Sequence, residues 1–119
     1  MMPYERFDAW QACYALALLT YRSTARFPKH EQYGMISQMR RAAFSSALNI
    51  AEGSARRGRA EFRRFLDISI GSLAELTVAI RMAKDLEYLD EEGWCALDAA
   101  CSRAGRLTMG LHKSMRGSS

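Results

Sequence analysis

The chain has 119 residues, of which 49% are hydrophobic and 25% are charged, and its formal net charge is +4. This length suits one domain with a sizeable buried core, and the apolar fraction is too high for a disordered chain. No apolar run approaches the roughly 18 residues that a membrane span needs, and the sequence starts without the basic-then-apolar pattern of a secretory signal. We therefore expect one globular domain over residues 1–119, with no membrane association and a cytoplasmic location.

Four helices are expected along the chain, at residues 7–26, 35–52, 59–86 and 90–114. The first ends before Pro28, because proline disfavours the helical conformation of the residue that precedes it. Gly53 is placed to end the second helix as a left-handed cap, and Asp90 is placed to begin the fourth as its N-cap. Because the connectors are short, the expected fold is all-α, an antiparallel up-down-up-down four-helix bundle.

Each expected helix carries a stripe of apolar residues at helical spacing, which predicts its core face. In the first helix this stripe contains Phe7, Trp10, Tyr14, Leu18, Tyr21 and Ala25. The stripes of the other three helices contain Ile36, Met39, Ala43, Ala47 and Ile50; Phe62, Phe65, Leu66, Ser69, Leu73, Leu76, Ile80 and Ala83; and Trp94, Leu97, Cys101, Ala104, Thr108, Leu111 and Met115.

Two helices are apolar on the opposite side as well. The residues concerned are Ala12, Leu16 and Leu19 in the first helix, and Ile68, Val78 and Met82, with Glu75 among them, in the third. A helix that is apolar on two sides is expected to be buried on two sides. We therefore predict that these residues form an interface between copies of the chain; broad packing within one copy is the alternative.

The second helix carries a polar stripe opposite its core face, formed by Gln38, Arg41, Ser45, Asn49 and Glu52. By itself this pattern is typical of a solvated helix face. Arg41 and Glu52 are eleven residues apart, so they cannot pair within one helix and must meet solvent, another helix or another subunit.

Charge is unevenly distributed along the chain. Residues 26–64 contain nine Lys and Arg against three acids, whereas residues 65–98 contain two against eight. Five arginines cluster around the expected turn between the second and third helices: Arg56, Arg57, Arg59, Arg63 and Arg64. Guanidinium groups bind phosphate through a planar fork, and the start of a helix adds a positive dipole end. The cluster predicts nucleic-acid binding directed at phosphates; a solubilising surface is the alternative.

No pattern in the sequence indicates catalysis, a metal site or a cofactor. Cys13, Cys95 and Cys101 lack the spacing of metal ligands and are expected to be reduced and structural. His30 lies in a polar connector and His112 lies near the C-terminus, so both are expected to be solvated. We therefore predict no catalytic residue, no metal ligand and no cofactor.

Several short motifs occur in a fixed order along the chain: Phe27-Pro28, Glu31, Gly34, Gln38, Arg41-Ala42, Ser45, Asn49-Ile50-Ala51-Glu52-Gly53, Arg64-Phe65-Leu66 and Gly71-Ser72-Leu73-Ala74-Glu75-Leu76. In this order they resemble the four-helix-bundle family of the 23S rRNA intervening-sequence proteins. The accessory variability determinant of diversity-generating retroelements is a relative of that family. The resemblance covers nearly the whole chain.

The resemblance implies a small cytosolic bundle that assembles as a ring of five and carries a basic surface. It also implies a structural role for the polar stripe, with contacts at helix ends or between subunits. Asn49→Ala or Glu52→Ala would then cost about 1–3 kcal/mol by leaving buried partners unpaired. The expected function is that of a non-enzymatic, pentameric scaffold that binds RNA or DNA. The alternative is an adaptor for a protein such as a reverse transcriptase, without direct nucleic-acid contact.

Overall fold

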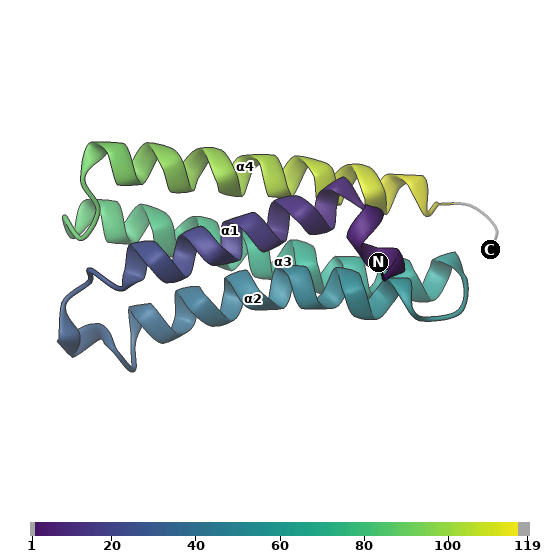
Figure 1. Ribbon diagram of the computed structural model, residues 1–119, viewed down its shortest axis with the longest axis horizontal. Helices are drawn as coiled ribbons and strands as arrows, with labels where there is room; N and C mark the ends of the chain where they lie inside the picture. The colour runs from purple at the N-terminus through teal and green to yellow at the C-terminus, as the bar shows by residue number, and fades with distance from the viewer. Residues whose placement is uncertain (1, 117–119) are drawn as a thin grey trace.

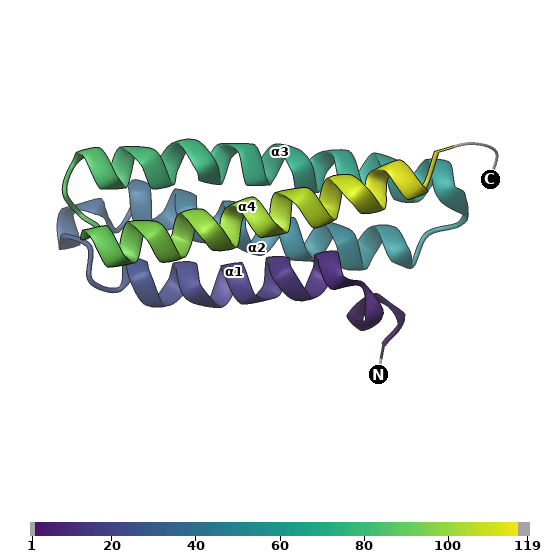
Figure 2. The same ribbon diagram turned by 90° about the horizontal axis from the view of Figure 1, so that it is seen from above.

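The computed structural model describes residues 2–116 and shows four antiparallel helices arranged as a rod of 47 × 25 × 23 Å (Figures 1 and 2). The helices are α1 (Asp8–Thr24), α2 (Met35–Ser54), α3 (Gly58–Asp85) and α4 (Glu91–Ser114), with short 3₁₀ helices at Pro3–Arg6 and Lys29–Glu31. Helices α2 and α4 each pack against both α1 and α3. The predicted all-α four-helix bundle is therefore confirmed. None of the helices within residues 2–116 combines the length and hydropathy that crossing a membrane requires.

The side of α1 that faces the core differs from the prediction. Its buried residues are Ala9, Ala12, Cys13, Leu16, Ala17, Thr20 and Thr24. Tyr14, Leu18 and Tyr21, which were predicted to be core, are exposed by 48%, 39% and 44%. Conversely, Ala12 and Leu16 were predicted to form an interface between copies, and they lie in the core of the single chain. That part of the interface prediction was wrong.

Small side chains and internally bonded threonines explain this orientation of α1. The hydroxyl of Thr20 donates to the carbonyl of Leu16 at 2.7 Å, and the hydroxyl of Thr24 donates to the carbonyl of Thr20 at 2.7 Å. A threonine that bonds its own helix in this way can be buried without an unsatisfied group. Alanines beside them let α1 approach its neighbours closely, and the bulky aromatic residues remain outside.

The predicted core stripes of the other helices are confirmed. All five stripe residues of α2 are buried, and those of α3 are buried except for the half-buried Phe65. In α4 the buried stripe residues are Leu97, Cys101, Ala104 and Thr108. The stripe residues nearer the ends of the helix, Trp94, Leu111 and Met115, are half-buried. Burial raises the pKa of the Cys13 and Cys101 thiols, as expected for structural cysteines.

Helices α2 and α3 pack closely through small residues. The hydroxyl of Ser69 on α3 donates to the carbonyl of Ser46 on α2 at 2.7 Å, and the hydroxyl of Ser46 donates to the carbonyl of Ala43 at 2.8 Å. A Cβ on Gly53 would lie 2.7 Å from Cβ of Phe65, which is closer than real Cβ atoms approach. The side chains at this contact must therefore remain small.

Gly53 has a different role from the one predicted. It lies within α2, which continues to Ser54, and it does not have the left-handed conformation of a C-terminal cap. The left-handed glycine is Gly58, with φ 80°, at the first position of α3. Gly53 is required because the ring of Phe62 and the Cβ of Phe65 pack against its backbone. The prediction for Asp90 is confirmed, because its Oδ1 accepts a hydrogen bond from the backbone N–H of Gly93 at 2.7 Å.

At the end of the bundle opposite the α2–α3 turn, Glu31 joins the α1–α2 connector to the α3–α4 connector. One carboxylate oxygen accepts from the backbone N–H of Met35 at 3.1 Å, and the other accepts from the hydroxyl of Tyr88 at 2.9 Å. These bonds to Met35 and Tyr88 lower the pKa of Glu31, and the bond to Glu31 raises the pKa of Tyr88. The ring of Phe27 packs 5.3 Å from that of Tyr88, centroid to centroid. The α1–α2 and α3–α4 connectors are thereby held together.

Gly53→Ala should destabilise the protein even though alanine is the better helix former. The added methyl overlaps Phe62 and Phe65, and overpacking of this kind costs about 1–3 kcal/mol. Gly105→Ala is the matched control, because nothing lies within 4 Å of a Cβ at Gly105, and alanine should stabilise α4 there by up to about 1 kcal/mol. Chemical denaturation of both variants checks this. A Gly53→Ala protein as stable as wild type would contradict the packing argument.

The Glu31 connection should make stability depend on pH in the acid range. The pKa of Glu31 in the folded protein lies below its ordinary value of 4.5, so its stabilising effect is full above that value. The effect is lost as the pH falls through the lowered pKa. Glu31→Gln should therefore melt at a lower temperature than wild type at pH 7, and the two melting temperatures should converge as the pH falls below 4.5. Glu87→Gln, an exposed change in the α3–α4 connector next to Tyr88, should follow wild type at every pH.

Candidate nucleic-acid interface

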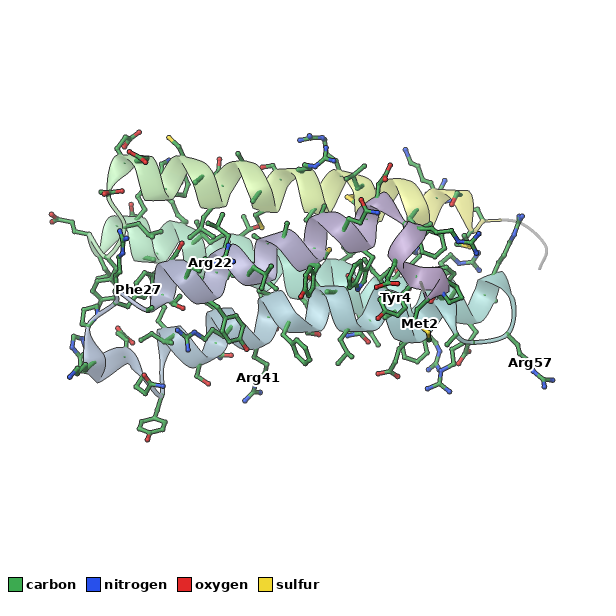
Figure 3. All side chains as sticks on the ribbon, in the orientation of Figure 1. Met2, Tyr4, Arg22, Phe27, Arg41 and Arg57 are labelled. Atoms are coloured by element: carbon green, nitrogen blue, oxygen red, sulfur yellow. The ribbon has the colours of Figure 1, made fainter. Side chains whose placement is uncertain are left out.

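The predicted arginine cluster lies at one end of the rod, around the turn between α2 and α3. Figure 1 places this turn at the same end as the C-terminal part of α4, and Figure 3 shows Arg57 extending from its tip. The left-handed Gly58 lets the chain reverse direction within the short segment 55–57 before α3 begins. Five arginines are thereby gathered over a short length, but they are not equivalent.

Arg56 and Arg64 pack on the ring of Phe65 and are partly neutralised. Their guanidinium carbons lie 5.1 Å and 5.6 Å from the centroid of that ring, within the range of a cation–π contact. Arg56 also pairs with Glu52 at 3.3 Å, and Arg64 pairs with Glu61 at 2.9 Å. Both pairs are exposed, so they orient the guanidinium groups more than they stabilise the fold.

Arg63 has a structural role. It donates to the main-chain carbonyl of Met115 at 2.9 Å, just beyond the end of α4, where cations also interact favourably with the helix dipole. A second contact nearby joins the same two helices, because His112 lies 2.8 Å from Asp67 on α3. His112 was predicted to be solvated, whereas its imidazole is largely covered and paired with a carboxylate.

Arg57 and Arg59 are the free members of the cluster. Both are exposed, and within residues 2–116 neither makes an ion pair or a side-chain hydrogen bond. They flank Gly58 at the start of α3, where the backbone N–H groups of a helix are unpaired and its dipole is positive. An anion that approaches the tip of the bundle meets these two side chains without having to break an existing contact.

The structure adds two cations that sequence reasoning did not place at this site. Lys113 and Arg116 are exposed near the end of α4, and the contact from Arg63 to Met115 brings that segment beside the arginine cluster. Five acidic residues around the α3–α4 connector occupy the opposite end of the rod: Asp85, Glu87, Asp90, Glu91 and Glu92. In an antiparallel bundle α4 must end where α3 begins. The predicted fold therefore already implies that Lys113 and Arg116 lie at the basic end and that the acids around the α3–α4 connector lie at the opposite end.

The polar stripe of α2 forms one bond to a neighbouring helix. The amide of Asn49 donates to the carbonyl and hydroxyl of Ser45 at 2.9 Å and 3.0 Å, and Ser72 on α3 donates to the Ser45 hydroxyl at 2.9 Å. Glu52 is exposed, and in the described part of the chain it pairs only with Arg56 of its own segment. Gln38 and Arg41 are also exposed.

The residues predicted as an interface between copies differ in how far they are buried. Ile68, Val78 and Met82 are exposed by 49%, 69% and 54%, and Glu75 is exposed among them on α3. Leu19 is half-buried, and Ala12 and Leu16 belong to the core, as described above. Sequence reasoning missed the outer apolar residues of α1 and α2, of which Tyr14, Tyr21 and Phe44 are the largest.

Within residues 2–116, no three His, Cys, Asp or Glu side chains come together as a set of metal ligands. The Cys95 thiol lies 3.7 Å from a Glu91 carboxylate oxygen, and the Tyr88 hydroxyl donates to Glu31 at 2.9 Å. Desolvation and the neighbouring acid raise the pKa of Cys95, and the hydrogen bond to Glu31 raises the pKa of Tyr88, so neither group is activated as a nucleophile. The arginine cluster is therefore the strongest candidate for a functional site in the described chain.

Comparison with known proteins places the chain in a family. The sequence matches the 23S rRNA-intervening sequence proteins over residues 5–110. The chain belongs to this family. Its fold is similar to the crystal structure of a protein of unknown function from the S23 ribosomal protein family of Bacteroides thetaiotaomicron, with a TM-score of 0.78 at 18% sequence identity. That similarity covers 88% of this chain and 98% of the other. Among curated proteins, none matches the chain.

The exposure of Glu52 changes what its substitution should do. Among residues 2–116 its one partner is an exposed arginine, so Glu52→Ala should alter the free energy of unfolding by no more than about 1 kcal/mol. Asn49→Ala removes the two bonds to Ser45 at a half-buried site and should cost about 1 kcal/mol. Urea unfolding of both variants at low protein concentration checks this order. A larger cost for Glu52→Ala would show that Glu52 has a buried partner outside the single chain.

Proposed function

We propose that this protein is a non-enzymatic scaffold that assembles with copies of itself and binds the phosphates of nucleic acid through its basic end. The observation that carries the proposal is the pair of free arginines, Arg57 and Arg59, at the tip of the bundle. Lys113 and Arg116 extend the same positive surface. Such a surface suits a polyanion more than a small anion, because its charges are spread along the end of the rod and enclose no pocket.

The binding proposed here is directed at the backbone of the nucleic acid. Phosphate contacts from arginine and lysine supply affinity without reading sequence. Of the aromatic rings near the cluster, Phe62 is buried, and Phe65 is half-buried and already contacted by Arg56 and Arg64. We therefore expect little stacking on bases and little preference among sequences.

Self-association would strengthen the binding of nucleic acid by this surface. One copy offers only a few free cations, whereas a ring repeats them at fixed spacing. Once one copy has bound a polyanion, the other copies meet the same polyanion at a high effective concentration. The exposed apolar stripe of α3, which includes Val78 and Met82, supports self-association, since such a stripe in a soluble protein marks a contact surface. A ring of five is the expectation that we take from the family resemblance.

A second candidate function is an adaptor that binds another protein, such as a reverse transcriptase, without touching nucleic acid. The exposed aromatic residues of α1 and α2 favour it, because aromatic side chains are enriched at protein interfaces. The two functions differ in how binding to nucleic acid depends on salt.

The test is fluorescence anisotropy of labelled single- and double-stranded RNA and DNA across a range of salt concentrations. Wild type should bind, and the logarithm of its association constant should fall linearly with the logarithm of salt concentration. Removing two phosphate contacts with Arg57→Gln and Arg59→Gln should reduce that slope by about 1.4 for single strands and about 1.8 for duplexes. Both side chains are free, so the variant should keep its fold.

The matched control removes two arginines from the opposite end, with Arg22→Gln and Arg26→Gln. Figure 3 shows Arg22 far from Arg57 along the rod. The control should retain the wild-type slope. If wild type binds no nucleic acid at low salt, the nucleic-acid proposal fails and the adaptor function is favoured. Equal slopes for the two variants would show that binding is not located at the arginine cluster.

A further inference from the structure

Two separate apolar surfaces remain uncovered on the single chain. The first, which we call the aromatic face, lies on α1 and α2 and the connector between them, and consists of Tyr14, Leu18, Tyr21, Tyr33, Phe44 and Leu48. The second, the α2–α3 groove, has a volume of about 600 Å³ and an apolar lining formed by Met35, Ala42, Val78, Ala79, Met82 and Leu86. Together they contain most of the large hydrophobic residues that are exposed between Met2 and Arg116.

The charged residues at the two surfaces have opposite signs. The charged residues next to Tyr21 and Phe44 are Arg40 and Arg41, with no acid among them. The charged residues that line the α2–α3 groove are Glu31 and Glu75, with no base among them.

One charge on each surface has no partner within the described chain. Arg40 is occupied, because it donates to the hydroxyl of Thr24 at 2.8 Å and to the carbonyl of Tyr21 at 3.1 Å. Glu31 is occupied by Met35 and Tyr88. Arg41 and Glu75 are both exposed, and neither makes an ion pair or a side-chain hydrogen bond with residues 2–116. Figure 3 shows Arg41 pointing away from the bundle.

These charges decide which pairs of surfaces can meet. Two aromatic faces related by a two-fold axis would bring Arg41 toward Arg41, and two grooves would bring Glu75 toward Glu75. Like charges in an apolar contact are costly, because each loses water without gaining a partner. An aromatic face against a groove instead places an arginine near a carboxylate.

The two surfaces are also complementary in shape. The groove is lined by the small side chains of Ala42 and Ala79 between larger residues, which leaves a hollow. Phe44 protrudes from α2 with 54% of its surface exposed, next to Arg41. Arg40 to Leu48 and Val78 to Leu86 each span eight residue steps, about 12 Å of helix at 1.5 Å per residue, so the two surfaces are similar in length.

We propose that the aromatic face of one copy docks into the α2–α3 groove of the next, with Phe44 in the hollow and Arg41 paired with Glu75 of that neighbour. The inference rests on the self-association proposed above and names the two surfaces that carry it. The contact is heterologous, so an open chain of copies keeps one aromatic face free at one end and one groove free at the other until it closes into a ring. The same contact would cover the exposed residues of both surfaces.

The test is light scattering coupled to size exclusion over a wide range of protein concentrations. Wild type should have several times the mass of the 13.4 kDa chain. Arg41→Glu and Glu75→Arg should each weaken assembly by roughly tenfold or more, because each creates a like-charge contact. The double variant, Arg41→Glu with Glu75→Arg, should recover the wild-type mass, because the pair is restored with its signs exchanged. Phe44→Ala should also weaken assembly without any change of charge.

The matched control exchanges two exposed charges of α4, with Arg103→Glu and Asp98→Arg, and it should retain the wild-type mass. Circular dichroism should show the same helix content for every variant, since all the charged positions are exposed. A wild-type protein that stays monomeric at every concentration would overturn both the proposed self-association and this contact. Wild-type assembly that survives both single reversals, or that the double variant does not recover, would overturn the contact and leave self-association intact.

Discussion

At the turn between α2 and α3, the missing side chain of Gly53 allows Phe62 and Phe65 to pack directly on the backbone of α2. This close approach fixes where α3 begins and how α3 is rotated about its own axis. The rotation places Phe65 between Arg56 and Arg64, and it directs Arg63 toward the end of α4. Arg57 and Arg59 are then left at the tip without ion-pair or side-chain hydrogen-bond partners between residues 2 and 116. A steric requirement in the core therefore determines which cations of the turn are available to a ligand.

The antiparallel order of the helices gives the rod an electrostatic direction. The basic turn and the end of α4 lie together at one end, and the acidic α3–α4 connector lies at the other (Figure 1). Such a distribution favours the approach of a polyanion at the end that carries the arginine cluster. The acidic end contains its own structural connection, in which Glu31 is held by Met35 and Tyr88. Binding and connector stability thus depend on charges at opposite ends of the molecule.

The orientation of α1 determines what the single chain leaves exposed. Because alanines and internally bonded threonines face the core, the aromatic side of α1 lies outside and joins Phe44 and Leu48 of α2. The outer stripe of α3 adds a second exposed apolar surface. Covering such residues would stabilise the protein, since burying each methylene group contributes about 0.8 kcal/mol. The proposed contact between copies gives both surfaces a partner.

The sequence by itself determined four helices, their connectors and the core faces of α2, α3 and α4, because each of these helices has one dominant apolar stripe at helical spacing. It also located the arginine cluster and identified the family. It could not orient α1, whose two sides are both apolar, because the choice depends on whether small or bulky residues fit against neighbouring helices. The antiparallel order that it predicts already places Lys113 and Arg116 beside these arginines, but it could not separate Arg57 and Arg59 from the paired ones. Arg56 and Arg64 are distinguished by pairing with acids three or four residues away, which depends on the side-chain geometry of the turn. Arg63 is distinguished by its contact with Met115, a residue far away in the chain that only the tertiary structure brings beside it.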